Sequence, residues 1–119
     1  MKIIESGKIK KIKERHQAEV SQQTGFPSAA THYLEPSIDL NKELITTPDA
    51  TFFVRIQGDE WRQFNILDND VLLIDRSIIP KNNDLALVVI NGAFQIIKVT
   101  TQSSFTLWGV ITYIIHFAR

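Results

Sequence analysis

The sequence predicts a mainly β fold: a single curved, mostly antiparallel domain with one short helix and an N-terminal arm. Runs rich in β-branched and aromatic residues recur through the second half of the chain. Turn-forming Asn, Asp and Gly residues separate these runs. The length of 119 residues and the 44% share of apolar residues suit one domain with one core.

Five runs are predicted to be strands, namely residues 51–56, 71–75, 85–90, 93–99 and 105–117. Between the third and fourth runs, Asn91-Gly92 is a two-residue hairpin turn of the favoured type. Residues 68–70 and 82–84 are loops rich in Asx residues. The strands are therefore expected to follow one another as hairpins and short loops.

The segment ahead of the strands is predicted to be less regular. Residues 37–45 have apolar side chains three and four positions apart, with Ser37 placed to cap a short helix. Residues 1–24 mix isoleucines with charges in a spacing that fits neither a strand nor a long helix, so this arm is expected to be mobile or partner-dependent. The predicted organisation is a basic arm, 1–24, and one domain, 25–119.

Composition excludes several functional classes. The charges of 13 basic and 13 acidic residues cancel, so the composition does not indicate a protein that coats nucleic acid or an anionic membrane. The charge is unevenly distributed, with a net charge of +3 on the arm and −3 on the remainder. The absence of cysteine excludes disulfides, zinc–thiolate sites and a thiol nucleophile. Without a signal-peptide core or a membrane-spanning stretch, a cytoplasmic location and no membrane association are expected.

No cofactor or metal is expected from the titratable side chains. His16, His32 and His116 are far apart and lack the spacing of metal ligands. The serines are interpreted as cap, turn and loop hydroxyls rather than nucleophiles: Ser28, Ser37, Ser77, Ser103 and Ser104.

Several segments, in matching order and spacing, resemble the LexA/UmuD family of self-cleaving serine–lysine peptidases. They are Gly25-Phe26-Pro27-Ser28, Ile38-Asp39-Leu40-Asn41, residues 53–59 and residues 68–75, and residues 108–111 are similar to the start of the family's last strand. The resemblance covers residues 25–119 and implies that family's fold. It is nearest to UmuD, because the 24 residues ahead of the cleavage position are too few for a DNA-reading domain.

The resemblance also implies where a catalytic dyad would lie. These peptidases use a Ser hydroxyl that a neutral Lys deprotonates. The nucleophile position after Gly58-Asp59 is Glu60, followed by Trp61, and the lysine position is Ile97. Lys98 is the next residue and is expected to project to the opposite face of its strand.

The cleavage position has changed as well. The family's scissile bond joins Cys or Ala to Gly, whereas here Thr24 precedes Gly25, and a β-branched residue is expected to fit the site poorly. Nucleophile, base and scissile pair are all replaced under this alignment. The sequence therefore predicts a pseudo-peptidase with no catalytic residues.

Two interpretations of Glu60 remain open. It is either an exposed loop carboxylate without a function, or Glu60 and Trp61 fill the former cleft or bind a segment such as the arm. Because an isolated buried carboxylate is costly, Arg62 and Lys98 are the expected partners of Glu60. Trp61 is expected to be a packing residue rather than a ligand anchor.

The chain between Val99 and Phe105 is about one hairpin shorter than in the family. The sheet edge left by that loss can be bare, covered by the arm or paired with another subunit. Family members dimerise through C-terminal strands, so the resemblance implies a homodimer through residues 110–117.

The resemblance implies a UmuD-like accessory protein of the SOS DNA-damage response. Such a protein binds an error-prone translesion polymerase and acts in DNA repair and SOS mutagenesis. The alternative is a non-enzymatic regulator that forms mixed dimers with intact LexA- or UmuD-type proteins. Direct binding of nucleic acid is not expected, because six basic residues in the arm without interleaved aromatics give weak phosphate contacts and no base readout.

Overall fold

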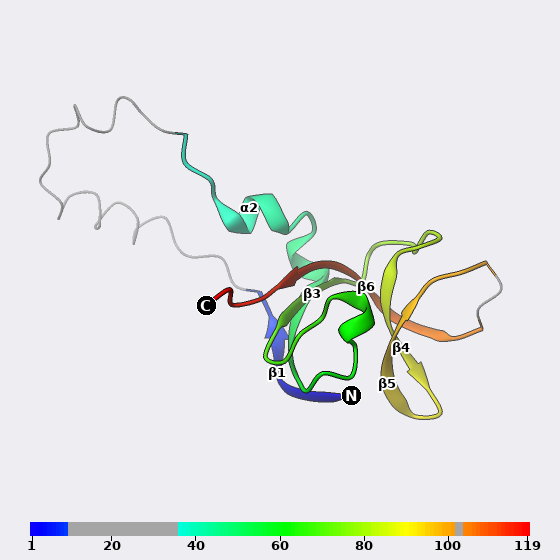
Figure 1. The fold of residues 1–119 in the computed structure, drawn as a ribbon. Helices are drawn as coiled ribbons and strands as arrows, with labels where there is room; N and C mark the ends of the chain where they lie inside the picture. Colours follow the sequence, from blue (N-terminus) through cyan, green and yellow to red (C-terminus); the bar gives the residue numbers. More distant parts are fainter. Residues whose placement is uncertain (10–35, 102–103) are drawn as a thin grey trace, which may run out of the picture. The chain divides into compact units, whose positions relative to one another are not determined.

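The computed structural model describes residues 1–9, 36–101 and 104–119 (Figure 1). The chain divides into two units, one formed by residues 1–9 with 46–119 and the other by residues 10–45. The strands of the described residues all lie in the first unit, and the described part of the second contains one short α-helix.

Six strands form a single antiparallel sheet in the order β1-β2-β3-β6-β4-β5. Their bounds are β1 Lys2–Lys8, β2 Thr51–Gln57, β3 Val71–Asp75, β4 Leu85–Ile90, β5 Ala93–Lys98 and β6 Thr106–Ile115. The sheet curls into a half-barrel (Figure 1). The predicted mainly β, antiparallel and curved fold is therefore confirmed.

Local turn chemistry explains why the predicted strands end where they do. Asn91 and Gly92, with φ of 52° and 78°, form the hairpin between β4 and β5, and a type I′ turn needs positive φ at both positions. In the Asx-rich loops, Asn69 and Asn83 adopt φ of 70° and 75°. Asn tolerates this left-handed conformation better than most residues, so these loops reverse the chain sharply.

Strand β1 differs from the expectation for the arm. Its residues pair with β2 as an edge strand, whereas the sequence predicts a mobile or partner-dependent segment throughout 1–24. The register shifts between Ile3 and Glu5, so Ile3 packs towards the core while Ile4 is 47% exposed. This irregularity breaks the two-residue apolar alternation by which a strand is recognised in a sequence. The predicted boundary at residues 24 and 25 lies outside the described residues.

The helix α2, Leu40–Leu44, is shorter than the predicted 37–45 and has a different cap. The carboxylate of Asp39, not the predicted Ser37, accepts hydrogen bonds from the backbone N–H groups of Asn41 and Lys42, at 3.0 and 3.4 Å. A carboxylate at this position satisfies free amides and also interacts favourably with the positive end of the helix.

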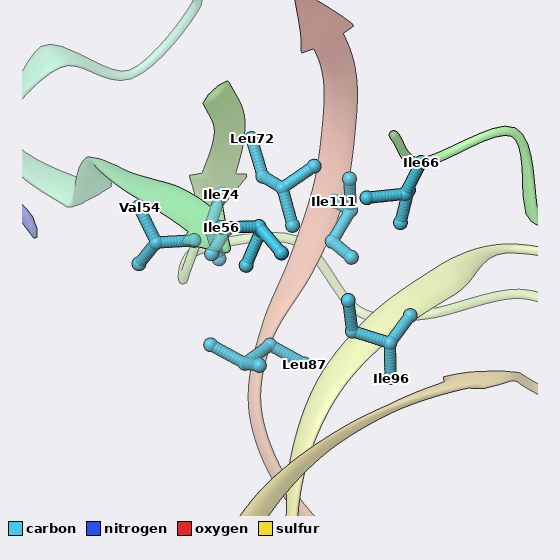
Figure 2. Packing of buried hydrophobic residues seen from close by; sticks show 8 residues of the cluster. All are labelled: Val54, Ile56, Ile66, Leu72, Ile74, Leu87, Ile96 and Ile111. Carbon is cyan, nitrogen blue, oxygen red and sulfur yellow. The ribbon is translucent and has the colours of Figure 1, made fainter. Parts of the chain in front are cut away.

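The main core lies against one face of the sheet (Figure 2). It consists of residues from β2 to β6 together with one from the loop before β3: Val54, Ile56, Ile66, Leu72, Ile74, Leu87, Ile96 and Ile111. A smaller cluster contains Ala86, Val88 and Val99. Because strand side chains alternate, Leu87 faces the main core while its neighbours in β4 face the smaller one.

Strand β6 approaches β3 closely at Gly109. A Cβ added to Gly109 would lie 2.5 Å from Cγ2 of Ile74 and 3.5 Å from the carbonyl oxygen of Asp75. Ile74 is fully buried in the main core, and side chains in a close-packed core have little freedom to move. The position therefore requires glycine for steric reasons.

We expect Gly109→Ala to lower the free energy of unfolding by about 1–3 kcal/mol, because the added methyl group overpacks the contact with Ile74. Urea denaturation monitored by circular dichroism measures this change. Thr106→Ala, at an exposed position of the same strand, is the control and is expected to change stability by less than about 0.5 kcal/mol. Equal stability of the two variants would contradict the steric account.

Candidate functional site

The turn that follows β2 carries the predicted nucleophile position. Gly58, at φ 101°, begins the turn in a conformation that other residues rarely adopt. Its backbone N–H donates to Oδ1 of Asp68 at 2.6 Å. This hydrogen bond joins the start of the turn to residues 66–70, the segment that leads back into the sheet and is called the returning limb of the turn. Between them, the 3₁₀-helix η3, Arg62–Phe64, ends at Asn65 in the left-handed region, with φ 63°.

Trp61 and Phe64 attach the turn to the main core. Their rings are stacked, with centroids 6.2 Å apart and an interplanar angle of 16°, and both pack against the core cluster. The carbonyl oxygen of Trp61 also accepts from the backbone N–H groups of Phe64 and Ile66, at 3.0 and 3.4 Å. Trp61 is thus a packing residue. Its buried indole N–H has no hydrogen-bond partner among the described residues.

The carboxylate of Glu60 is 55% exposed and forms an ion pair with the amino group of Met1, with 3.2 Å between Oε2 and the nitrogen. The expected partners were wrong: within residues 1–9, 36–101 and 104–119, neither Arg62 nor Lys98 forms an ion pair. The physical reason is the antiparallel pairing of Lys2 with Gln57, which brings the start of β1 beside the turn. Of the two interpretations left open by the sequence, this contact favours the one in which Glu60 binds a segment of the arm.

Ile97 and Lys98 lie on opposite faces of β5, as strand alternation requires. Ile97 packs against the smaller cluster, whereas Lys98 is exposed and shares the face of Ile96, a member of the main core. Trp61 packs against that same core. Lys98, rather than Ile97, therefore lies on the face of β5 that is turned towards the aromatic residues of the turn. The assignment of Ile97 to the lysine position stays a prediction.

The returning limb of the turn is held by a buried carboxylate. Asp70 is 1% exposed, and its Oδ2 accepts from the backbone N–H of Leu67 at 2.7 Å. The Nδ1 atom of His116 lies 3.6 Å from the same oxygen. Asp70 also accepts, through its carbonyl oxygen, from the amide of Ile56 at 2.9 Å. The sequence predicted an Asx-rich loop here but gave no signal that this carboxylate is buried.

Other predicted site features lie elsewhere. Thr24 and Gly25, like His16 and His32, are outside the described residues. Among the residues that the structure describes, no group of three or more His, Cys, Asp or Glu side chains can hold a metal ion. Within the same residues, no helix is long and apolar enough to cross a membrane.

The described strands form an antiparallel β half-barrel, and the turn after β2 carries the predicted nucleophile position. The peptidase S24-like family matches residues 18–107, and the chain belongs to that family. This confirms the resemblance to the LexA/UmuD group of peptidases, but it does not test the replacement of the dyad.

Three relatives match over most of their length, and a fourth matches over a third of its length. Protein ImpA of Salmonella typhimurium is 31% identical, over 82% of this chain and 80% of that protein. Protein SamA of S. typhimurium strain LT2 is 30% identical, over 80% of each chain, and protein MucA of Escherichia coli is 26% identical, over 75% of each. The LexA repressor of Caldicellulosiruptor saccharolyticus is 33% identical, but over 56% of this chain and 33% of its own length.

We expect Asp70→Ala to lower the free energy of unfolding by about 1–3 kcal/mol, because the backbone N–H of Leu67, which is partly buried, loses its acceptor. Urea denaturation is the measurement. Asp59→Ala is the matched control, since Asp59 lies in the same turn and is exposed. A cost for Asp70→Ala no larger than that of the control would show that this carboxylate does not secure the turn.

Proposed function

We propose that this chain is a non-catalytic, UmuD-like accessory protein of the SOS DNA-damage response that acts in the cytoplasm and binds an error-prone translesion polymerase. The proposal is supported by Glu60, which the resemblance puts at the nucleophile position and whose carboxylate forms an ion pair with the amino group of Met1. The matches to ImpA, SamA and MucA over most of each chain support a UmuD-like rather than a repressor-like protein.

The chemistry of the turn supports the loss of activity. A carboxylate lacks the hydroxyl that a serine peptidase uses to form its acyl-enzyme, and Ile97 has no group that can take up a proton. Ser77 does not provide a substitute, because its Oγ donates to Oδ1 of buried Asp75 at 2.6 Å. That hydroxyl serves the loop after β3 rather than a reaction.

The proposed homodimer surface is narrower than residues 110–117. Val110 and Ile111 are buried and pair with both β3 and β4, so they have no free edge for a second subunit. Tyr113, Ile115 and Phe117 are 42%, 45% and 81% exposed. These three apolar side chains form the part of the C-terminal run that can contact another copy.

The sheet edge predicted from the missing hairpin corresponds to β5. This strand pairs with β4 and is the last strand in the sheet order, while β1, the strand that comes from the arm, pairs at the opposite edge. Of the three alternatives, the arm's described strand does not cover this edge. An uncovered strand edge can recruit an extended segment of a partner.

The second candidate function uses the same surfaces with a different partner: a regulator that forms mixed dimers with intact LexA- or UmuD-type proteins. The exposed apolar residues 113, 115 and 117 favour it as well, since a family relative would carry a comparable strand. The two functions therefore differ in the identity of the bound protein and not in the fold.

We expect the purified chain to give no product cut between Thr24 and Gly25 during incubation at alkaline pH, because neither nucleophile nor base is present. Mass spectrometry of the incubated protein is the measurement, and an active family member provides the positive control. Glu60→Ser alone is expected to remain uncut, since Ile97 supplies no base. A specific product that persists in Glu60→Ala would refute the proposed loss of chemistry.

We expect tagged protein recovered from cells after DNA damage to retain a translesion polymerase, identified by mass spectrometry and confirmed with the two purified proteins. Retention of an intact LexA- or UmuD-type protein without a polymerase would support the second candidate instead. Tyr113→Ser with Phe117→Ser tests the proposed dimer surface, and sedimentation is expected to show a shift from dimer to monomer. An unchanged mass would exclude that surface.

A further inference from the structure

We propose that the edge of β5 is a self-association surface: β5 of one copy pairs antiparallel with β5 of a second copy about a two-fold axis, and the two sheets become continuous. The occupant of the edge is the segment Ala93–Lys98 of another molecule of this chain. Pairing with another subunit is one of the three alternatives that the sequence left open for this edge. The inference depends neither on polymerase binding nor on the apolar residues 113, 115 and 117.

The backbone of β5 presents a regular set of groups to this edge. Because Asn91-Gly92 closes a two-residue hairpin, the odd-numbered residues of β5 exchange backbone hydrogen bonds with β4. The ladder continues in the same phase beyond the strand, where the N–H of Val99 donates to the carbonyl oxygen of Asp84 at 2.8 Å. Among the described strands, none pairs with the other side of β5. The residues that direct N–H and C=O groups to that side are Phe94, Ile96 and Lys98.

The two edge strands differ in their protection against further pairing. β1 has a register shift between Ile3 and Glu5. It also carries charges at Lys2, Glu5 and Lys8, and irregularities and charges of this kind discourage a strand edge from recruiting another strand. β5 pairs with β4 without a register shift, contains no proline and has a single charge, at Lys98. The β5 edge is therefore the less protected of the two.

The sequence of β5 is self-complementary in one antiparallel register. Centring the pair on Ile96 places Phe94 of each copy directly opposite Lys98 of the other. The Phe94 side chain is 37% exposed, and an ammonium group over its ring would stabilise the pair. On the other face of the sheet, Gln95 then lies opposite Ile97. No like charges are opposed, so a second copy of β5 fits this edge.

Neighbouring registers fit less well. A shift by one residue would oppose free backbone groups to groups already bonded to β4. A shift by two residues places Ile96 opposite Phe94 or Lys98 and removes the contact between these two. In the preferred register, the two Lys98 residues are four positions apart, which is about 13 Å along a strand. That distance exceeds the Debye length of about 8 Å at physiological salt, so their repulsion is largely screened.

A second copy is a better occupant of this edge than an unrelated extended segment. A two-fold interface uses the same patch on both subunits, so one contact satisfies the free backbone groups of two molecules. A foreign segment would satisfy those of one molecule only. A single strand pair is expected to bury less than the roughly 1,200 Å² of a stable complex. The association is therefore expected to be weak and to be populated at high protein concentration.

The chain contains no cysteine, so introduced thiols report the register directly. Chains carrying Phe94→Cys are mixed with chains carrying Lys98→Cys and oxidised mildly, since both positions are exposed. Opposite residues that exchange hydrogen bonds have Cα atoms about 5.5 Å apart, which a disulfide can bridge. Intact-mass spectrometry is expected to find the heterodimer several-fold above the homodimer of either variant, because identical positions lie about 13 Å apart.

Two control mixtures test whether the cross-link is specific. Thr106→Cys, at an exposed position of β6, replaces Lys98→Cys in one, and Ile4→Cys, at an exposed position of β1, replaces it in the other. Both are expected to give little heterodimer. A yield with Lys98→Cys no higher than with Thr106→Cys would overturn the proposal. A yield with Ile4→Cys as high as with Lys98→Cys would assign the β5 edge to β1 of another copy and would overturn it as well.

A proline tests the backbone pairing without a cross-link. Lys98→Pro removes an N–H that points away from β4, whereas Lys98→Ala removes the same side chain and keeps that N–H. Both changes are made in the Tyr113→Ser, Phe117→Ser variant. Circular dichroism confirms folding, and sedimentation equilibrium is measured at concentrations above those at which this parent variant is monomeric. The dissociation constant is expected to be several-fold higher with proline than with alanine.

Equal dissociation constants for the proline and alanine variants, or no association of the parent variant, would overturn the proposal. The surface at Tyr113 and Phe117 is tested separately, by the mass of the parent variant at low concentration. The cross-linking experiment reads the β5 edge whether or not that second surface forms a dimer. Failure of one proposal is therefore distinguishable from failure of the other.

Discussion

The central position of β6 is the constraint on which the rest of the sheet depends. β3 and β4 follow each other in the sequence but do not pair, and β6 lies between them, antiparallel to both. One side of β6 holds β1-β2-β3 and the other holds β4-β5. The close approach at Gly109 makes this arrangement possible, because any side chain there would collide with Ile74. The core therefore combines residues from both halves of the sheet.

Side chains around Trp108 strengthen the same junction. The edges of Phe52 and Phe94 approach the Trp108 ring, with centroids 5.5 and 6.2 Å away, and these residues come from β2 and β5. The guanidinium of Arg76 lies 4.3 Å from the ring centroid, and its Nε donates to the carbonyl oxygen of Trp108 at 2.8 Å. Trp108 thus joins strands from the two halves of the sheet through aromatic and cation–π contacts.

The sequence was informative where local chemistry decides the structure. The bounds of β3 and β4 were predicted correctly, because β-branched runs end at Asx loops and at the Asn91-Gly92 turn. The insertion of β6 between two earlier strands was not predictable from local patterns, since it depends on pairing between distant segments. Strand β1 was not predicted for a related reason. The register shift between Ile3 and Glu5 interrupts the alternation of apolar residues, and that shift is not visible in the sequence.

The candidate site shows the same division. The alternation of Ile97 and Lys98 follows from strand geometry and needs no tertiary information. The partner of Glu60 depends on the register between β1 and β2, and no pattern in the sequence fixes that register. The burial of Asp70 likewise depends on tertiary contacts, because the returning limb of the turn is hydrogen-bonded to Ile56 at the end of β2.

The place of β6 in the sheet also has a consequence for the order of folding during synthesis. A ribosome releases β3, β4 and β5 before β6, so β3 and β4 emerge with the edges that will later flank β6 still unpaired. Two separate hairpin-like pieces can form in that interval, but neither has a complete core. Long-range pairing of this kind slows folding and leaves strand edges open to other chains. The sheet is therefore complete only after residues 106–115 have paired with both β3 and β4.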